Sequence, residues 1–190
     1  MLSLDRTNWA HGETPINFLV LGAVVHGFTL PLIWVPLDES GNSHTYARMW
    51  LVLKLLRALP AKRWLGLVAD REFIGAEWFR FLRRHGIKRA IRIRHSDMLD
   101  DMSGKEWFEH VQHGHFHEIA EKVFVFGELM RVVATRSPTG DLVIIATDFS
   151  ARKTWKLYKQ RWSIECTFSS FKKRGFDLER TGITEKSRLQ

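Results

Sequence analysis

The sequence predicts a single α/β domain, on three observations. A strand, a helix and a second strand follow one another between Trp64 and Arg94, which is typical of a parallel pair with a crossover helix. Strand-like apolar runs fill the N-terminal third, and a stretch without Gly or Pro from about Ala151 to Lys173 predicts a long final helix. With 190 residues, 45% of them hydrophobic, the chain can bury one core.

The part of the chain before the crossover is expected to be rich in strands. Apolar runs bounded by turn-forming residues predict the strands, and apolar residues at helical spacing that stop before Pro60 predict one helix. The expected elements are a strand over residues 1–4 that ends at Asp5, a turn over residues 6–8, strands over residues 18–25 and 28–37 joined by a tight turn at 26–27, and a helix over residues 44–59.

The crossover and the segment after it are expected to add further strands. Trp64–Ala69 and Ile87–Arg94 read as strands, and Ala76–His85 reads as a helix closed by Gly86. Two more β-rich runs, over residues 123–135 and 141–149, flank a turn at residues 137–140. We expect these runs to form an inserted hairpin or small sheet within about residues 97–149, ahead of the last helix.

Composition excludes several classes of protein. The longest apolar run, Phe18–Pro36, is interrupted by Gly, His and Pro and is too broken for a membrane span. The N-terminus lacks the pattern of a signal peptide, so a cytoplasmic location is expected. The single cysteine, Cys166, allows neither an internal disulfide nor a thiolate-rich zinc site.

The positive charge is concentrated in the last 40 residues. The net charge is +8, and residues 151–190 hold 11 Lys and Arg against 4 Asp and Glu, whereas residues 1–150 hold 18 against 17. A concentrated basic patch is what neutralisation of nucleic-acid phosphates requires. A basic tail that is merely solvated is the alternative.

One glutamate, Glu165, stands among the cations of the expected final helix. At about 100° per residue, Tyr158, Arg161, Glu165 and Lys172 fall within an arc of about 60° and share one face. The neighbouring stripe is apolar and would pack on the sheet; it consists of Leu157, Ile164, Phe168 and Phe171. An amphipathic surface helix with an Arg161–Glu165 ion pair is the alternative.

Two aspartates are expected at the carboxyl ends of strands, where α/β sheets place their sites. Asp5 follows the first apolar strand and Asp70 follows the run LGLVA. With Glu165 they form the smallest oxygen set for two hard divalent cations, which keep further positions for water or phosphate. Two such metal ions, bound side by side, can catalyse phosphodiester cleavage. Either aspartate could instead cap a following turn or helix.

The stretches LSLDRTNW and LVADREF, with the spacing Tyr-x2-Arg-x3-Glu-x6-Lys, resemble the DDE transposases of bacterial insertion sequences, in particular family four, the branch named for its Tyr-Arg-Glu-Lys signature. The resemblance spans nearly the whole chain. It implies an RNase H-like fold, with a mixed sheet, flanking helices and a β-rich insertion before the last catalytic helix. It further implies that Asp5, Asp70 and Glu165 are the catalytic triad and bind two Mg²⁺ or Mn²⁺ ions.

The resemblance also implies roles for the cations and aromatics around the triad. Tyr158, Arg161 and Lys172 would hold DNA phosphates near the cut. Trp162 is similar to an aromatic that some relatives place near a flipped base during hairpin chemistry, with plain packing as the alternative. Arg71 would either reach a phosphate or orient Asp70.

The activity implied is cut-and-paste DNA transposition, by metal-assisted hydrolysis at the transposon ends and strand transfer of the freed 3′ hydroxyl. The partners implied are DNA and, for the full-length protein, a second subunit, in a bacterial, nucleoid-associated setting. Family members carry a DNA-binding region before the first catalytic strand and continue past the signature helix. We therefore expect residues 1–190 to be a catalytic core with both flanking parts missing.

Two other interpretations stay open. The first is a truncated, catalytically idle transposase remnant that binds DNA non-specifically or inhibits intact transposase. The second, which the Tyr-Arg-Glu-Lys face argues against, is a stand-alone RNase H-like nuclease. An active enzyme is favoured by four intact residues, Asp5, Asp70, Glu165 and Lys172, whereas the missing flanking parts favour a remnant.

Two further stretches carry weaker hypotheses. The run EHVQHGHFHE, residues 109–118, contains four histidines at a spacing that could bind zinc or nickel, with a solvated loop or strand as the alternative. The run KRAIRIRH, residues 88–95, alternates apolar and basic residues. It would either track a DNA backbone or protect an exposed sheet edge.

Overall fold

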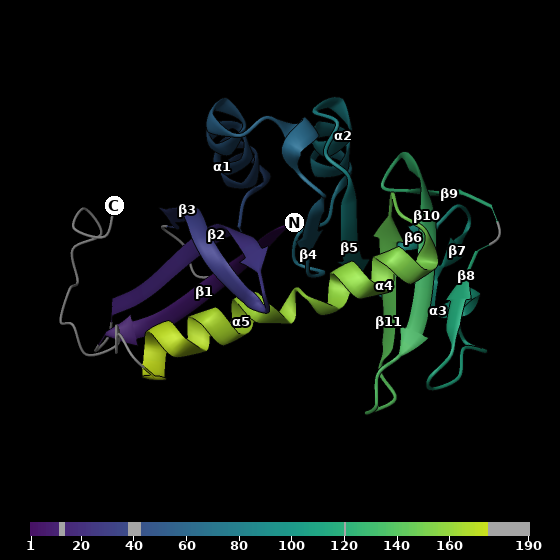
Figure 1. Cartoon of the computed structure of the whole chain (residues 1–190). Coiled ribbons are helices and arrows are strands. Elements are labelled where there is room, and N and C mark those ends of the chain that lie inside the picture. Colours follow the sequence, from purple (N-terminus) through teal and green to yellow (C-terminus); the bar gives the residue numbers. More distant parts are fainter. Residues whose placement is uncertain (12–13, 38–42, 120, 175–190) are drawn as a thin grey trace.

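The structure is a computed structural model that describes residues 1–11, 14–37, 43–119 and 121–174. Within these residues, one large mixed sheet has the strand order β3-β2-β1-β4-β5-β11-β10-β8, with β9 paired to β10 (Figure 1). Its strands are β1 (Leu2–His11), β2 (Thr14–Val25), β3 (Phe28–Pro36), β4 (Leu67–Ala69), β5 (Arg89–Ile93), β8 (Phe116–Glu118), β9 (Val123–Val125), β10 (Glu128–Arg136) and β11 (Leu142–Thr147). The α/β class predicted from the sequence is confirmed.

The remaining elements are helices and one short strand pair. The strand pair is β6 (Met98–Leu99) with β7 (Met102–Ser103). The helices and helical turns are α1 (Thr45–Ala58), η1 (Ala61–Arg63), α2 (Ala76–Arg84), α3 (Gly104–Trp107), α4 (Ala151–Lys159), α5 (Trp162–Ser169) and the π-helical turn η2 (Ser170–Arg174). Among the described helices, none is long and apolar enough to cross a membrane.

The first three strands form an antiparallel meander, and the turn between β2 and β3 is the one expected. His26 and Gly27 both have positive φ, 48° and 86°, as a two-residue hairpin turn requires. The expected turn over residues 6–8 is wrong, because β1 continues through Asp5 to His11. Cross-strand pairing from Asp5 with Val20 to His11 with Thr14 overrides the local turn preference of these residues.

The crossover places β4 between β1 and β5, parallel to both. Leu67 and Ala69 face one core cluster and Val68 faces another, so β4 is buried on both faces. This explains why the strand reads as an unbroken apolar run. The observed strand is shorter than the expected Trp64–Ala69.

Helices cover both faces of the sheet (Figure 1). On one face, α1 and α2 pack Leu51, Trp78 and Phe79 against the buried leucines of β1 and β2. On the other face, Leu157 of α4 packs on Val68 and Ala90. Further along the same face, α5 packs on β2; the residues in contact are Ile164, Phe168, Ile16, Phe18 and Val20. The apolar stripe predicted for the final helix is therefore buried.

The expected single helix over residues 151–173 is wrong, because α4 and α5 are separated at Gln160 and Arg161. The N–H groups of these two residues bond to carbonyls three residues back, those of Leu157 and Tyr158, at 3.1 and 2.9 Å. The Ser163 hydroxyl donates to the Gln160 carbonyl at 2.7 Å. A turn of this kind tightens the helix locally and interrupts the regular pattern of bonds four residues apart.

The expected hairpin in the later segment is present, but the run over residues 123–135 is divided into β9 and β10 by a turn at Phe126 and Gly127, which have positive φ. Strands β10 and β11 pair antiparallel on either side of the turn at residues 137–140, and β11 also pairs with β5. The hairpin therefore extends the main sheet. Strand β5 has a neighbour on each side, so the run KRAIRIRH does not lie at a sheet edge, and that alternative is wrong.

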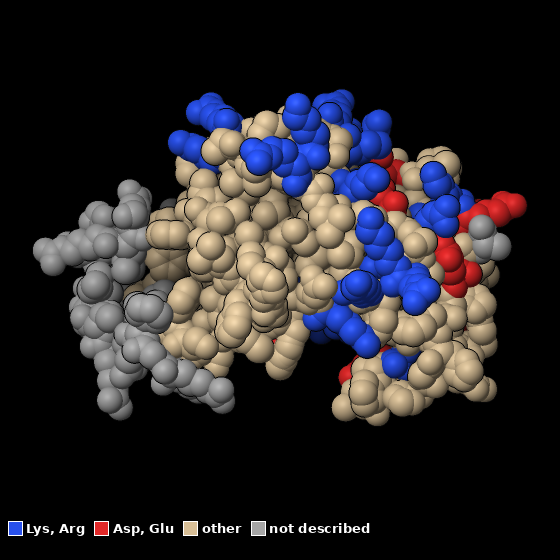
Figure 2. Space-filling view, in the orientation of Figure 1, with Lys and Arg blue, Asp and Glu red and all other residues tan. Residues whose placement is uncertain are grey.

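Lysines and arginines cluster on the side of the molecule shown in Figure 2. They lie over α1 and α2 at the top and over α4 nearer the centre. The cations of α4 are all exposed: Arg152, Lys153, Lys156 and Lys159. The helix that leads into the Tyr-Arg-Glu-Lys signature thus presents a basic outer surface.

A buried arginine fixes where α4 begins. The Arg89 side chain is only 3% exposed. Its Nε donates to Asp148 Oδ2 at 3.1 Å, and its guanidinium donates to the Phe79 carbonyl and lies 4.0 Å from Glu128 Oε2. The backbone N–H of Asp148 returns a bond to the Arg89 carbonyl at 3.0 Å. Because Asp148 lies just before α4, Arg89 ties that helix to the centre of the sheet.

We predict that Arg89→Met lowers the free energy of unfolding by about 2–3 kcal/mol, because it removes the buried guanidinium that donates to Asp148 and to the Phe79 carbonyl, whereas Glu128 keeps its ion pair with Arg83. Urea unfolding followed by tryptophan fluorescence measures the loss. The matched control is Arg131→Met, which removes an ion pair with Glu118 whose side chains are 47% and 31% exposed. That control should cost about 1 kcal/mol or less. Equal losses in the two variants would contradict the role of Arg89.

Candidate active site

The parallel pairing of β1 with β4 brings two aspartates together. Leu2, Ser3 and Leu4 pair with Leu67, Val68 and Ala69, so the next residues in register are Asp5 and Asp70. Strand β4 ends there, whereas β1 continues along β2 alone. The sequence predicted Asp5 at the end of the first strand, but Asp5 lies inside β1. It still lies where the parallel pairing stops.

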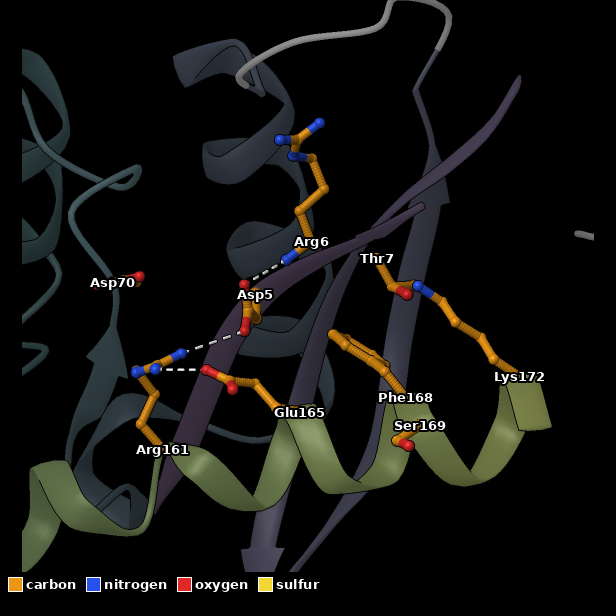
Figure 3. Close-up of a pocket in the computed structure, with 9 residues that line it drawn as sticks. All are labelled: Asp5, Arg6, Thr7, Asp70, Arg161, Glu165, Phe168, Ser169 and Lys172. Carbon is orange, nitrogen blue, oxygen red and sulfur yellow. Dashed lines mark hydrogen bonds and ion pairs between the residues drawn. The ribbon is translucent and has the colours of Figure 1, made fainter. Parts of the chain in front are cut away.

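Helix α5 brings Glu165 and Arg161 to the same place (Figure 3). The Arg161 guanidinium donates to Asp5 Oδ2 at 3.4 Å and to Glu165 Oε1 at 2.5 Å. The Tyr158 hydroxyl, at the end of α4, donates to Asp70 Oδ1 at 3.4 Å. Arg161 thus lies between two of the three carboxylates, and Tyr158 holds the third.

The three carboxylates and Arg161 line one hollow of about 530 Å³. Its lining residues are Asp5, Arg6, Thr7, Asp70, Arg161, Glu165, Phe168, Ser169 and Lys172. The three carboxylates supply only oxygen donors, which suits a hard divalent cation such as Mg²⁺ or Mn²⁺. Within the described part of the chain, no three acidic, His or Cys side chains are already clustered as metal ligands. The Arg161 guanidinium lies between Asp5 and Glu165 and contacts both.

Burial dominates the electrostatics of the hollow. It raises the pKa of Asp5 to about 6, against the opposing effect of the Arg6 N–H and the Arg161 charge. It also raises the pKa of Tyr158 to about 12, so that hydroxyl remains a donor at neutral pH. Burial by itself lowers the pKa of Arg161. The groups around it, Tyr158 most and then the three carboxylates, outweigh burial and raise that pKa above its usual value.

The other residues expected at the site are divided between the hollow and the surface. Lys172 lines the hollow, and its Nζ donates to the Asn8 carbonyl at 2.5 Å. Trp162 is half-exposed, and Arg71 is exposed; neither is among the residues that line the hollow.

Four residues that line the hollow were not expected there. Arg6 and Thr7 directly follow Asp5 on β1, and Phe168 and Ser169 lie three and four residues after Glu165 on α5. The sequence could have indicated the last two, because side chains three and four residues apart share one face of a helix. Phe168 was expected only in the apolar stripe.

The histidine run lies elsewhere. His110, His115 and His117 line a separate hollow of about 240 Å³, and the rings of His110 and His117 are 4.6 Å apart, edge to face. His113 is not among the residues that line it. Within the described residues these side chains do not form a metal-binding group of three or more.

The raised pKa of Asp5 predicts a pH-dependent stability. The folded, metal-free protein binds the Asp5 proton more tightly than the unfolded chain does, because the pKa of Asp5 in the unfolded chain is about 4. The stability linked to that proton is present below about pH 4 and is lost as the pH rises through about 6. We predict that Asp5→Asn is more stable than the wild type at pH 8, by at most about 3 kcal/mol, and nearly equal at pH 4.

Thermal unfolding in EDTA at the two pH values measures this difference. The matched control is Asp101→Asn, which changes an exposed aspartate away from the hollow and should leave the stability unchanged at both pH values. A less stable Asp5→Asn protein at pH 8 would contradict the predicted cost of ionising Asp5.

Comparisons with solved structures place the fold. The chain is similar to the piggyBac transposase in a synaptic complex with hairpin DNA, at 11% identity and a TM-score of 0.59, over 90% of this chain and 40% of that one. The chain thus spans well under half of that transposase. Endonuclease V from Ciona intestinalis, in complex with inosine-containing DNA, follows at 10% identity and a TM-score of 0.47, over 100% and 86% of the two chains. The catalytic domain of human Endonuclease V matches at 13% identity and a TM-score of 0.46, over 90% of this chain and 82% of that one.

The fold is RNase H-like, with a large mixed sheet and flanking helices. No curated protein sequence matches this chain. A family model described as the transposase DDE domain matches residues 2–190. Because that match covers almost every residue, the chain belongs to the family of transposase DDE domains.

Proposed function

We propose that this chain is the catalytic core of a cut-and-paste transposase of the bacterial insertion sequences, in family four. Membership of the DDE family supports transposition catalysis in general. The observation that carries the finer proposal is that Asp5, Asp70 and Glu165, from three elements far apart in the chain, line one hollow. The reaction would be phosphodiester hydrolysis at transposon ends followed by strand transfer.

Transposase domains of this family generally use divalent metals. The carboxylates of Asp5, Asp70 and Glu165 would hold two Mg²⁺ or Mn²⁺ ions. Their donor chemistry and common hollow fit such ions. When bound, the ions activate the attacking oxygen and stabilise the leaving oxygen.

The protein's own side chains prepare the carboxylates. Tyr158 stays protonated at neutral pH and orients Asp70 through its hydrogen bond. Arg161 neutralises Asp5 and Glu165 and thereby limits the repulsion that would otherwise separate them. With cations held by these carboxylates, the Arg161 guanidinium would be available to a DNA phosphate, for which its planar fork is well suited.

DNA, as transposon ends and target, is the proposed partner, and the surface charge supports this. The net charge is +8, and exposed cations lie along α4, the helix that directly precedes Arg161 and Glu165 in the chain (Figure 2). Lys172 lies at the hollow and exposed Arg71 lies close to Asp70, so both could contact phosphates. Trp162 is half-exposed beside Arg161, as an aromatic that stacks on a flipped base must be.

The setting proposed for this activity is the nucleoid of a bacterial cytoplasm, with two subunits acting on paired transposon ends. The β-rich insertion would cover about residues 97–149, of which β10 and β11 extend the sheet.

A second candidate function is a DNA-binding chain that does not cut. The observation that favours it is the position of Arg161, which already compensates the charge of two carboxylates in this structure. Such a chain would bind DNA non-specifically or inhibit intact transposase. Metal-dependent cleavage separates the two functions.

We predict Mn²⁺-dependent nicking of supercoiled plasmid by the wild type. Asp70→Ala should reduce the rate by at least about 100-fold, because it removes a metal ligand, and should retain DNA binding in a gel-shift assay. The matched control Asp101→Ala, in an exposed turn, should nick at the wild-type rate. DNA binding without nicking by the wild type would favour the second candidate function. Equal nicking by wild type and Asp70→Ala would exclude the proposed site.

A further inference from the structure

We propose that Glu72 is a positioning residue that fixes the relative placement of Asp5 and Asp70, an inference that rests on the proposed function. Glu72 lies two residues after Asp70, and its carboxylate pairs with Arg6, the residue directly after Asp5. The pair thus joins the segment that carries one aspartate to the segment that carries the other.

The contact with Arg6 uses both carboxylate oxygens. Arg6 Nε lies 3.1 Å from Glu72 Oε1 and 3.2 Å from Oε2, and the side chains are 23% and 18% exposed. The backbone N–H of Arg6 donates to Asp5 Oδ1 at 2.8 Å. In Figure 3 the Arg6 side chain extends away from Arg161 and Glu165. Glu72 therefore also holds the Arg6 guanidinium away from the carboxylates of Asp5, Asp70 and Glu165. Closer to them, the guanidinium would compete with metal ions.

On its other side Glu72 is held by the residues that precede α1. The backbone N–H and hydroxyl of Ser43 donate to Glu72 Oε1 at 3.1 and 3.3 Å. Ser43 is in turn fixed by Arg48, whose guanidinium donates to its hydroxyl at 2.9 Å and to its carbonyl at 2.5 Å. Arg48 is only 4% exposed, so this support is rigid.

The same arginine reaches the loop after Asp70. Arg48 donates to the Ile74 carbonyl at 3.4 Å and lies over the Phe73 ring at 5.1 Å. The Phe73 N–H donates to the Asp70 carbonyl at 2.9 Å. Arg48 therefore anchors the loop after Asp70 at Phe73 and Ile74, the two residues that directly follow Glu72.

The backbone does not provide this link. Parallel pairing of β1 with β4 stops at Leu4 and Ala69, one residue before the two aspartates. Past that point the Arg6–Glu72 pair spans the two segments. A partly buried pair that uses both carboxylate oxygens has a narrower geometry than a single contact. Loss of the pair should let the aspartates separate and weaken metal binding.

A purely structural role for Glu72 predicts lower stability with unchanged metal affinity. We therefore measure Mn²⁺ affinity by isothermal titration, well below the unfolding midpoint of each variant. Glu72→Gln should bind Mn²⁺ about tenfold more weakly than the wild type, as expected for loss of an outer-shell partner. The matched control Glu118→Gln breaks the Arg131 pair at 3.1 Å, away from the hollow, and should bind like the wild type.

Two further variants sharpen the test. The double variant Arg6→Gln with Glu72→Gln should bind Mn²⁺ no more weakly than either single variant, because each substitution removes the same Arg6–Glu72 interaction. Arg6→Lys keeps the charge and all contacts of Glu72 with Ser43, and so provides a folded reference if Glu72→Gln unfolds. Arg6→Lys should weaken binding by severalfold, because both contacts with Glu72 are made by Arg6 Nε and lysine carries its only side-chain nitrogen one atom further from the backbone.

Unchanged affinity in Glu72→Gln and Arg6→Lys, while Asp70→Ala loses binding, would overturn the role of Glu72 and leave the proposed function intact. Absence of Mn²⁺ binding by the wild type, or full binding by Asp70→Ala, would overturn the proposed function together with this inference.

Discussion

The parallel pairing of β1 with β4 is the constraint on which the candidate site depends. It sets Asp5 and Asp70 in register at the point where β4 ends. Burial of β4 on both faces holds that pairing, since its residues belong to two core clusters on opposite sides of the sheet. The site is thus built beside a strand that is buried on both faces, which gives its carboxylates fixed positions.

A second constraint is the charge of the hollow itself. Three carboxylates in one hollow repel one another, and burial adds a cost that is visible in the raised pKa of Asp5. Arg161 offsets both effects from within the chain, as it contacts Asp5 and Glu165 at once. Arg161 thereby stabilises the folded protein at the proposed binding site for metal ions and DNA.

Much of this arrangement could be predicted from the sequence, because its signals are local. The apolar runs before Asp5 and Asp70 indicate strands, and helical spacing puts Arg161 and Glu165 on one face. The break between α4 and α5 was missed, yet Tyr158 and Arg161 still face the carboxylates, because residues three apart align in a tightened turn.

What could not be predicted depends on partners distant in sequence. The extension of β1 past Asp5 comes from pairing with β2, which overrides the turn preference of residues 6–8. The link from Arg6 to Glu72 spans 66 residues, and no local pattern indicates it. The position of Arg89 beneath α4 likewise depends on Asp148, 59 residues away.

The most direct test of the account is anomalous diffraction from crystals of the protein soaked in Mn²⁺. The account predicts manganese in the hollow, bound by Asp5, Asp70 and Glu165, with the Arg161 guanidinium moved away from Asp5 and Glu165. A hollow without manganese at saturating concentration, with Arg161 still between the two carboxylates, would contradict it.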